Sequence, residues 1–123
     1  MNVTATDFVT VPTQDFEASR RFYGETLGLA FGKQWGKMPA AEYETGNLTI
    51  AIMQMDAFGQ EFRVSGGMIA LQVEDVEATR SELEGKGIEF KGDTIDSGVC
   101  HMAIFADPEG NPLMLHHRYA PPA

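Results

Sequence analysis

Residues 15–20 read DFEASR and residues 75–80 read DVEATR, so one phrase occurs twice in a chain of 123 residues. Four of the six positions are identical, and the other two pairs are similar in character. Self-similarity at a fixed spacing is typical of a repeated structural unit. The sequence therefore predicts two related modules, offset from each other by the spacing between the two phrases.

Each copy of the phrase has the features of a helix start. Asp15 and Asp75 suit the N-cap position, because a carboxylate there accepts hydrogen bonds from free backbone N–H groups. Hydrophobic residues then recur at helical spacing, which extends the first helix to about Leu27. Gly28 and Gly87 supply the left-handed residue that commonly ends a helix. We therefore expect one helix in each module.

Hydrophobic runs follow the same order around both helices. One strand is expected before each helix and three after it, so each module is predicted to fold as βαβββ in one α+β domain over residues 1–123. Module one covers about residues 5–55, module two covers about residues 67–118, and a polar joint separates them at about residues 56–66. The expected strands lie at 8–13, from 28–31 onward, 38–44 and 48–55 in module one, and at 68–73, from 87–90 onward, 98–106 and 112–118 in module two.

Charge and composition exclude several partners. The formal net charge is −9, and such a surface repels nucleic acid phosphates and anionic lipid, so neither nucleic acid nor membrane is expected as a partner. No apolar run approaches the ~20 residues that a membrane-spanning helix needs. The N-terminus has no basic stretch followed by an apolar one, and Cys100 is the only cysteine. These features favour a cytoplasmic location.

Two longer motifs carry a resemblance to a known family. RRFYGETLGL (20–29), FADPEGNPLML (105–115) and the paired βαβββ order resemble the glyoxalase/bleomycin-resistance/extradiol-dioxygenase superfamily, also called vicinal oxygen chelate proteins. The resemblance implies that each module forms a curved, open mixed sheet. It also implies that two modules pair into a cup, often across a homodimer, and that enzymes of the family hold a divalent metal there by His and Glu residues.

The family pattern identifies four ligand positions in this chain. The first lies early in the first strand, at Phe8, and its counterpart one repeat later is Met68. The last ligand, usually Glu, lies three residues after the Gly-Asn pair that opens the final strand, which gives Met114 in module two and Ile50 in module one. None of these side chains is a normal ligand for a divalent ion. We therefore expect no metal and no cofactor.

Strand alternation predicts which other side chains face the cup, because residues two apart share a face. The four apolar positions then form a floor that either fills the cup as core or buries a ligand, since ligand pockets are mostly apolar. Trp35, in a loop between glycines, and Tyr43, between two glutamates, are candidates for the rim. The expected ligand-binding residues are Phe8, Thr10, Trp35, Tyr43, Ile50, Ile52, Met68, Gln72, Met114 and His116, with Gln54 and Ala70 on the same face.

His116 and His101 are the candidate catalytic residues, since histidine titrates near neutral pH. His116 follows Met114 by one pleat and should point into the cup. The direction of His101 depends on the strand register. If Ala106 pairs with Pro112, then Cys100, Met102 and Ile104 share the face of Met114; a shift by one residue would place His101 there, opposite His116. Cys100 is read as a buried structural thiol.

Two functions follow from these expectations. The first is a protein that binds a small, largely apolar organic ligand in a metal-free cup, which the four apolar ligand positions favour, with a homodimer as the expected assembly. The alternative is a lyase, isomerase or dioxygenase-type enzyme that uses His116, with or without His101, or an atypical metal site. A purely structural module would need a filled cup.

Overall fold

The structure is a computed structural model that describes residues 1–121. The chain forms two compact units, Met1–Ser65 and Gly66–Ala123. The boundary between them falls inside the polar joint expected at about residues 56–66.

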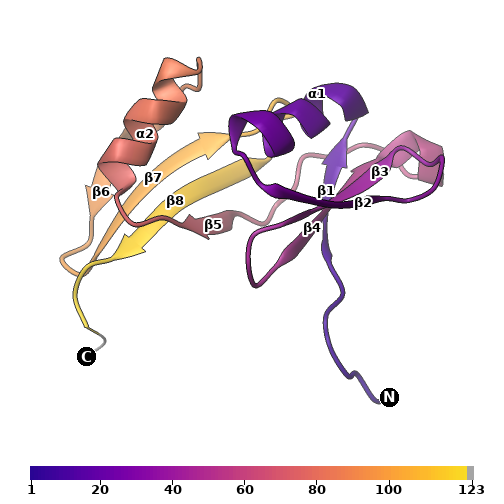
Figure 1. The fold of residues 1–123 in the computed structure, drawn as a ribbon, viewed down its shortest axis with the longest axis horizontal. Helices are drawn as coiled ribbons and strands as arrows, with labels where there is room; N and C mark the ends of the chain where they lie inside the picture. Colours follow the sequence, from indigo (N-terminus) through magenta and orange to yellow (C-terminus); the bar gives the residue numbers. More distant parts are fainter. Residues whose placement is uncertain (122–123) are drawn as a thin grey trace. The chain divides into compact units, whose positions relative to one another are not determined.

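The first unit contains a four-stranded mixed sheet in the order β1-β4-β3-β2, with β1 parallel to β4 and the other neighbours antiparallel (Figure 1). The helix α1 continues into a π-helical turn, η1, so the predicted helix is present but widens in its second half. The elements are β1 (Val9–Thr13), α1 (Phe16–Arg21), η1 (Phe22–Thr26), β2 (Ala30–Gln34), β3 (Ala40–Glu44), β4 (Thr49–Gln54) and the 3-10 helix η2 (Met55–Phe58).

The second unit repeats this plan in the order β5-β8-β7-β6, with β5 parallel to β8. Two βαβββ modules, each with one mixed sheet, confirm the α+β class that the repeat predicted. The second helix lies alongside β7 and β8 (Figure 1). The elements are β5 (Ile69–Gln72), α2 (Val76–Gly85), β6 (Lys91–Asp96), β7 (Cys100–Ala106) and β8 (Pro112–Arg118).

The predicted helix caps are confirmed in both units. The Oδ1 atom of Asp15 accepts a hydrogen bond from the backbone N–H of Ala18 at 3.1 Å, and Asp75 accepts one from Ala78 at 3.0 Å. Gly28 and Gly87 follow the helices with φ of 71° and 92°, which side chains with a Cβ rarely adopt. The repeated phrase therefore sets the start of each helix by the same contact.

The core of the first unit lies between α1 and one face of its sheet. Ile50 and Ile52 of β4 are fully buried on this face, together with Val11 of β1. The hydroxyl groups of Thr13 and Ser19 share a buried hydrogen bond of 2.7 Å, which ties β1 to α1. Burial of these apolar side chains supplies most of the stability of the unit.

The core of the second unit lies between α2 and the corresponding face of its sheet. Leu113, Leu115 and Phe105 are almost fully buried there, and Val76 and Leu83 of α2 are buried as well. Register places these sheet residues on one face, because Leu113 pairs with Phe105 across β7 and β8. The opposite face of each sheet therefore points away from the α-helix of its own unit.

The DPEGN segment (107–111) is the tight turn that joins β7 to β8. The backbone N–H of Gly110 donates to the carbonyl of Asp107 at 3.0 Å, as in a type I turn. The Asp107 carboxylate accepts bonds from the backbone N–H groups of Glu109 and Asn111, both at 2.9 Å. The motif is therefore explained by turn geometry.

Candidate functional site

Each sheet has one face that packs against the helix of its own unit and an opposite face, called here the second face. In the first unit, the second face contains a row of residues that are paired from strand to strand across the sheet. Thr10 pairs with Ala51, Ala51 with Glu42 and Glu42 with Lys33. Met53 lies on the same face, since it is two residues after Ala51. Thr10 Oγ1 approaches the sulfur of Met53 at 3.4 Å.

Three aromatic rings gather at the second face of the first unit. The rings of Phe8 and Trp35 meet edge to face with centroids 5.1 Å apart, and Phe58 meets Trp35 at 6.1 Å. All three are half-buried. The indole N–H of Trp35 donates to Glu42 Oε2 at 2.7 Å, which fixes the ring relative to β3. We call Phe8, Trp35, Phe58 and Glu42 the aromatic cluster.

The prediction that Ile50 and Ile52 share the face of Phe8 and Thr10 is wrong. Register pairs Ile50 with Val9 and Ile52 with Val11, so both isoleucines lie on the helix side with no exposed surface. Gln54 lies two residues further along β4, so strand alternation places it on the helix side as well. The position that corresponds to Met114 in the first unit is Ala51.

The cause of this error is a difference in loop length. In the first unit the backbone N–H of Thr45 bonds to the carbonyl of Leu48, so Gly-Asn forms the whole loop. In the second unit Asp107 bonds to Asn111, and the loop is one residue longer. Counting three residues from Gly-Asn therefore gives Ile50 in module one, which is one residue before the corresponding position, Ala51. An error of one residue exchanges the two faces of a strand.

Tyr43 is also on the helix side, against expectation. It pairs with Ile50, is only 3% exposed, and lies under Gly24, where an added Cβ would come within 3.1 Å of its ring. Its hydroxyl accepts a hydrogen bond from Arg20 Nε at 3.5 Å, and this bond raises the pKa of the guanidinium. Tyr43 therefore does not reach the second face.

A cavity of about 400 Å³ lies on the helix side of the first unit. Arg20 crosses one end of it, with its guanidinium carbon 5.6 Å from the ring centroids of both Phe16 and Phe31. Glutamates and arginines line it in equal number, so it has no net charge preference. Its lining residues are Glu17, Arg20, Arg21, Gly24, Glu25, Leu29, Phe31 and Tyr43.

The second face of the second unit agrees with the prediction. Ala70 pairs with Met114 and Gln72 with His116, so these side chains lie together. Met68 precedes β5 by one residue, in step with Ala70, and is 43% exposed. Ala106 pairs with Pro112, so the register is the first of the two alternatives, and Met102 and Ile104 join this face opposite His116 and Met114.

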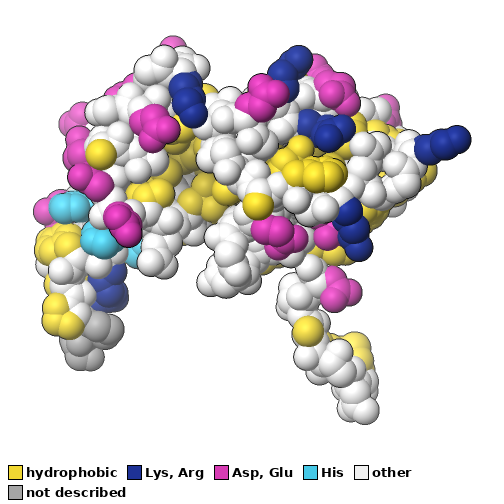
Figure 2. Space-filling model, viewed as in Figure 1, with side chains coloured by type: hydrophobic (Ala, Val, Ile, Leu, Met, Phe, Trp, Pro, Cys, Tyr) yellow, Lys and Arg dark blue, Asp and Glu magenta, His cyan; other side chains and the backbone are white. Residues whose placement is uncertain are grey.

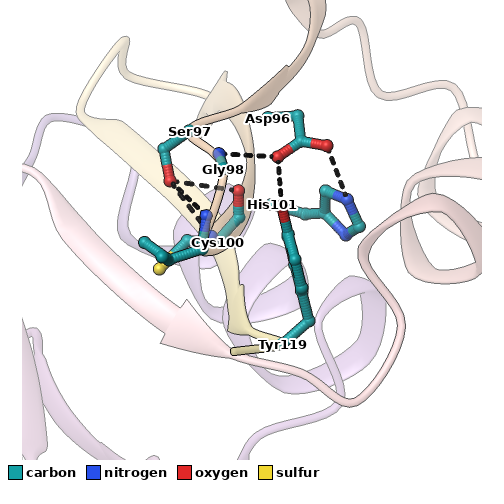
Figure 3. Close-up of polar contacts among 7 residues, drawn as sticks. Asp96, Ser97, Gly98, Cys100, His101 and Tyr119 are labelled. Carbon is teal, nitrogen blue, oxygen red and sulfur yellow. Dashed lines mark hydrogen bonds and ion pairs between the residues drawn. The ribbon is translucent and has the colours of Figure 1, made fainter. Parts of the chain in front are cut away.

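His101 lies on the opposite face from His116. It pairs with His117, so the alternative in which His101 and His116 face each other does not hold. Its Nε2 atom lies 3.4 Å from Asp96 Oδ2, and its ring stacks on Tyr119 with centroids 4.7 Å apart (Figure 3). Cys100, the neighbouring residue, is a buried free thiol, as expected.

Asp96 organises this second cluster. Its Oδ1 atom accepts hydrogen bonds from the backbone N–H of Gly98 at 2.9 Å and from the hydroxyl of Tyr119 at 2.8 Å (Figure 3). These bonds, led by that of Gly98, lower the pKa of Asp96, while the bond to the carboxylate raises the pKa of Tyr119. The groups are exposed, and their contacts hold the chain after β8 to the turn between β6 and β7.

The residues at the family ligand positions do not fit a divalent metal. These positions hold Phe8 and Ala51 in the first unit and Met68 and Met114 in the second. Hydrocarbon and isolated thioether groups are not donors for the ions that the family uses. Among residues 1–121 no group of three or more His, Cys, Asp or Glu side chains is placed to hold a metal ion.

The surface of the described residues is acidic. Figure 2 shows, on the face drawn, acidic side chains spread over both units and interspersed with Lys and Arg, and the formal net charge is −9. No helix within residues 1–121 is long and apolar enough to cross a bilayer.

Comparison with known proteins identifies the family. A model of the Glyoxalase/Bleomycin resistance protein/Dioxygenase superfamily matches residues 5–115. The chain therefore belongs to this superfamily, as its motifs indicated. A curated relative, the uncharacterised protein YraH of Bacillus subtilis (strain 168), is 25% identical over 114 residues, covering 83% of this chain and 89% of YraH.

Solved structures share the fold at low identity. Lactoylglutathione lyase from Agrobacterium tumefaciens has a TM-score of 0.76 at 14% identity, with 94% of each chain covered. TnmS3, an antibiotic binding protein from Streptomyces sp. CB03234, has a TM-score of 0.75 at 21% identity, covering 96% of this chain and 98% of TnmS3. The same fold thus serves a lyase and a binding protein, so the side chains of the site must decide between them.

Proposed function

We propose that the protein binds a small, largely apolar organic ligand at the second faces of its sheets, without the metal used by enzymes of the family. The observation that carries this proposal is the aromatic cluster. Its rings are only half-buried, and the hydrogen bond from Trp35 to Glu42 holds the indole in place before any ligand arrives. A fixed aromatic surface loses little entropy on binding, which favours affinity.

The second unit offers a surface of the same kind. Met68, Met102 and Met114 present flexible apolar side chains that adapt to a ligand. Gln72 and His116 stand beside them as polar groups that can orient it. Apolar surface removed from water contributes about 25 cal/mol per Å², before the cost of association.

Support also comes from the fold comparison. TnmS3 is described as an antibiotic binding protein, and this chain shares its fold over nearly its whole length. The four apolar residues at the family ligand positions favour binding by burial over binding through a metal.

A thermal-shift screen with uncharged aromatic compounds tests the proposal, since a ligand of the folded state raises the melting temperature. Phe8→Ser should reduce the shift caused by a hit. Phe31→Ser is the matched control, because Phe31 is 53% exposed but lies on the helix side beside the cavity. Equal losses in both variants, or a loss only in Phe31→Ser, would contradict binding at the second face.

An enzyme of the lyase, isomerase or dioxygenase type is a second proposal, and the position of His116 favours it. His116 is half-buried on the second face, where Gln72 and Met102 are its cross-strand neighbours. A histidine there can carry a proton to or from a bound ligand. His116→Ala should then abolish turnover while ligand binding remains, whereas unchanged turnover would remove His116 from the reaction.

We propose further that the protein acts as a homodimer in the cytoplasm. The dimer is the assembly that the family resemblance implies, and the one cysteine is a buried free thiol, which suits a reducing compartment. Sedimentation velocity of the purified protein should give twice the chain mass of 13.5 kDa. A species of single-chain mass at all concentrations would refute the dimer.

A further inference from the structure

We propose that Glu42 makes the site in the first unit selective for ligands that carry a cationic nitrogen next to their apolar body. This inference rests on the proposed function and adds the charge of the ligand to it. The sequence pattern predicts Tyr43 at the rim and makes no prediction for Glu42. The register reverses the two: Glu42 lies on the second face and Tyr43 beneath the helix.

Glu42 is a shielded carboxylate in aromatic surroundings. Its side chain is 15% exposed, and its backbone lies between Ala51 and Lys33 in the cross-strand row. Shielding a carboxylate from water in this way costs free energy unless a charged or hydrogen-bonding partner replaces the lost water. Trp35 supplies one hydrogen-bonding partner, and a ligand cation would supply a charged one.

The contacts of Glu42 leave one oxygen for a ligand. Trp35 Nε1 donates to Oε2 at 2.7 Å, and Lys33 Nζ lies 4.0 Å from the same atom. A carboxylate has about four acceptor positions on its two oxygens. In the described part of the chain both contacts are made at Oε2, so Oε1 keeps its capacity to accept a bond from an ammonium group.

Lys33 does not cancel this preference. Its side chain is 70% exposed on the edge strand β2, and the separation of 4.0 Å is that of a weak, solvent-screened pair. A ligand ammonium can therefore displace Lys33 from the carboxylate.

The experiment uses three probes with one ring system and three charges: 1-naphthylmethylamine, 1-naphthylmethanol and 1-naphthoate. Trp35 is the only tryptophan in the chain, so the single indole cross-peak in a ¹⁵N–¹H correlation spectrum reports on the cluster directly. Titration at neutral pH should show that the amine binds about tenfold more tightly than the alcohol, as expected for one charge-assisted hydrogen bond. The naphthoate should bind most weakly.

Glu42→Gln removes the charge but keeps an oxygen that can accept the bond from Trp35. The preference for the amine over the alcohol should disappear in this variant, while the affinity for the alcohol stays within about twofold. Glu44→Gln is the matched control, because Glu44 lies on the same strand and face but is exposed and bonds to Thr49. It should keep the preference.

The outcomes separate the two proposals. If the alcohol and the amine bind the wild type equally, or if Glu42→Gln keeps the preference, the selectivity is wrong although the binding function stands. If no probe shifts the indole cross-peak or any other resonance, both are wrong. If the probes shift only residues around the cavity on the helix side, the ligand site itself is misplaced.

Discussion

Ala51 in β4 and Met114 in β8 occupy the same position in the two sheets. Ala51 pairs with Thr10, and Met114 pairs with Ala70, which follows Thr10 at the spacing of the repeat. Where the family pattern expects a ligand of a metal, one module presents a methyl group and the other a thioether. The two second faces therefore rely on apolar contact.

The two faces of β4 should differ sharply in their tolerance to truncation. Ile52→Ala should lower the free energy of unfolding by about 2–5 kcal/mol, because it leaves a cavity in the core under α1. Met53→Ala removes a half-buried side chain from the second face and should cost much less. Chemical denaturation of both variants measures this. Equal costs would contradict the register that places Ile52 in the core.

The hydrogen bond from Trp35 to Glu42 should be visible in a double-mutant cycle. Trp35→Phe leaves the shielded carboxylate without its donor, and we expect a loss of about 1.5–3 kcal/mol in unfolding free energy, the range for bonds to charged groups. Trp35→Phe combined with Glu42→Gln should cost less than the two single changes added together, since residues in contact are coupled. Strict additivity would show that the pair does not interact.

The contact of Tyr119 with Asp96 should stabilise the fold only over a limited range of pH. The pKa of Asp96 is lowered from 3.8, so its contribution is present above that value and is lost as pH falls through the folded pKa. The pKa of Tyr119 is raised from 10.0, so its contribution is present below that value and is lost as pH rises through the folded pKa.

Tyr119→Phe tests this pH range. The difference in melting temperature between the wild type and the variant should be constant near neutral pH and shrink towards both extremes. The bond from Gly98 remains in the variant, so the pKa of Asp96 should stay partly lowered. A difference that does not change with pH would mean that the hydroxyl contributes by packing alone.

The sequence was a good guide wherever the signal was local. The N-cap bonds of Asp15 and Asp75 and the positive φ at Gly28 and Gly87 depend on neighbours within a few residues, so the repeated phrase located both helices. Strand alternation also placed Gln72 with Met114 correctly, because β5 and β8 contain no irregularity.

The sequence was a poor guide where two distant segments had to be aligned. The face of Ile50 depends on how many residues form the loop between β3 and β4, and Gly-Asn occurs in both loops although the loops differ in length. The length of the loop decides this case, and the Gly-Asn motif does not state it. Tyr43 was predicted at the rim from its position between two glutamates, whereas the register places Glu42 on the second face.

The most direct test of ligand binding at the second faces uses the methyl groups of methionine, of which the chain has seven. Met53 in the first unit and Met68, Met102 and Met114 in the second lie on these faces, and no methionine lines the cavity on the helix side. Protein labelled with ¹³C in these methyl groups should show saturable shifts of these second-face resonances when 1-naphthylmethanol is added, while Met1 is unaffected. Saturable shifts confined to residues around the cavity on the helix side, or no shifts at all, would contradict the account.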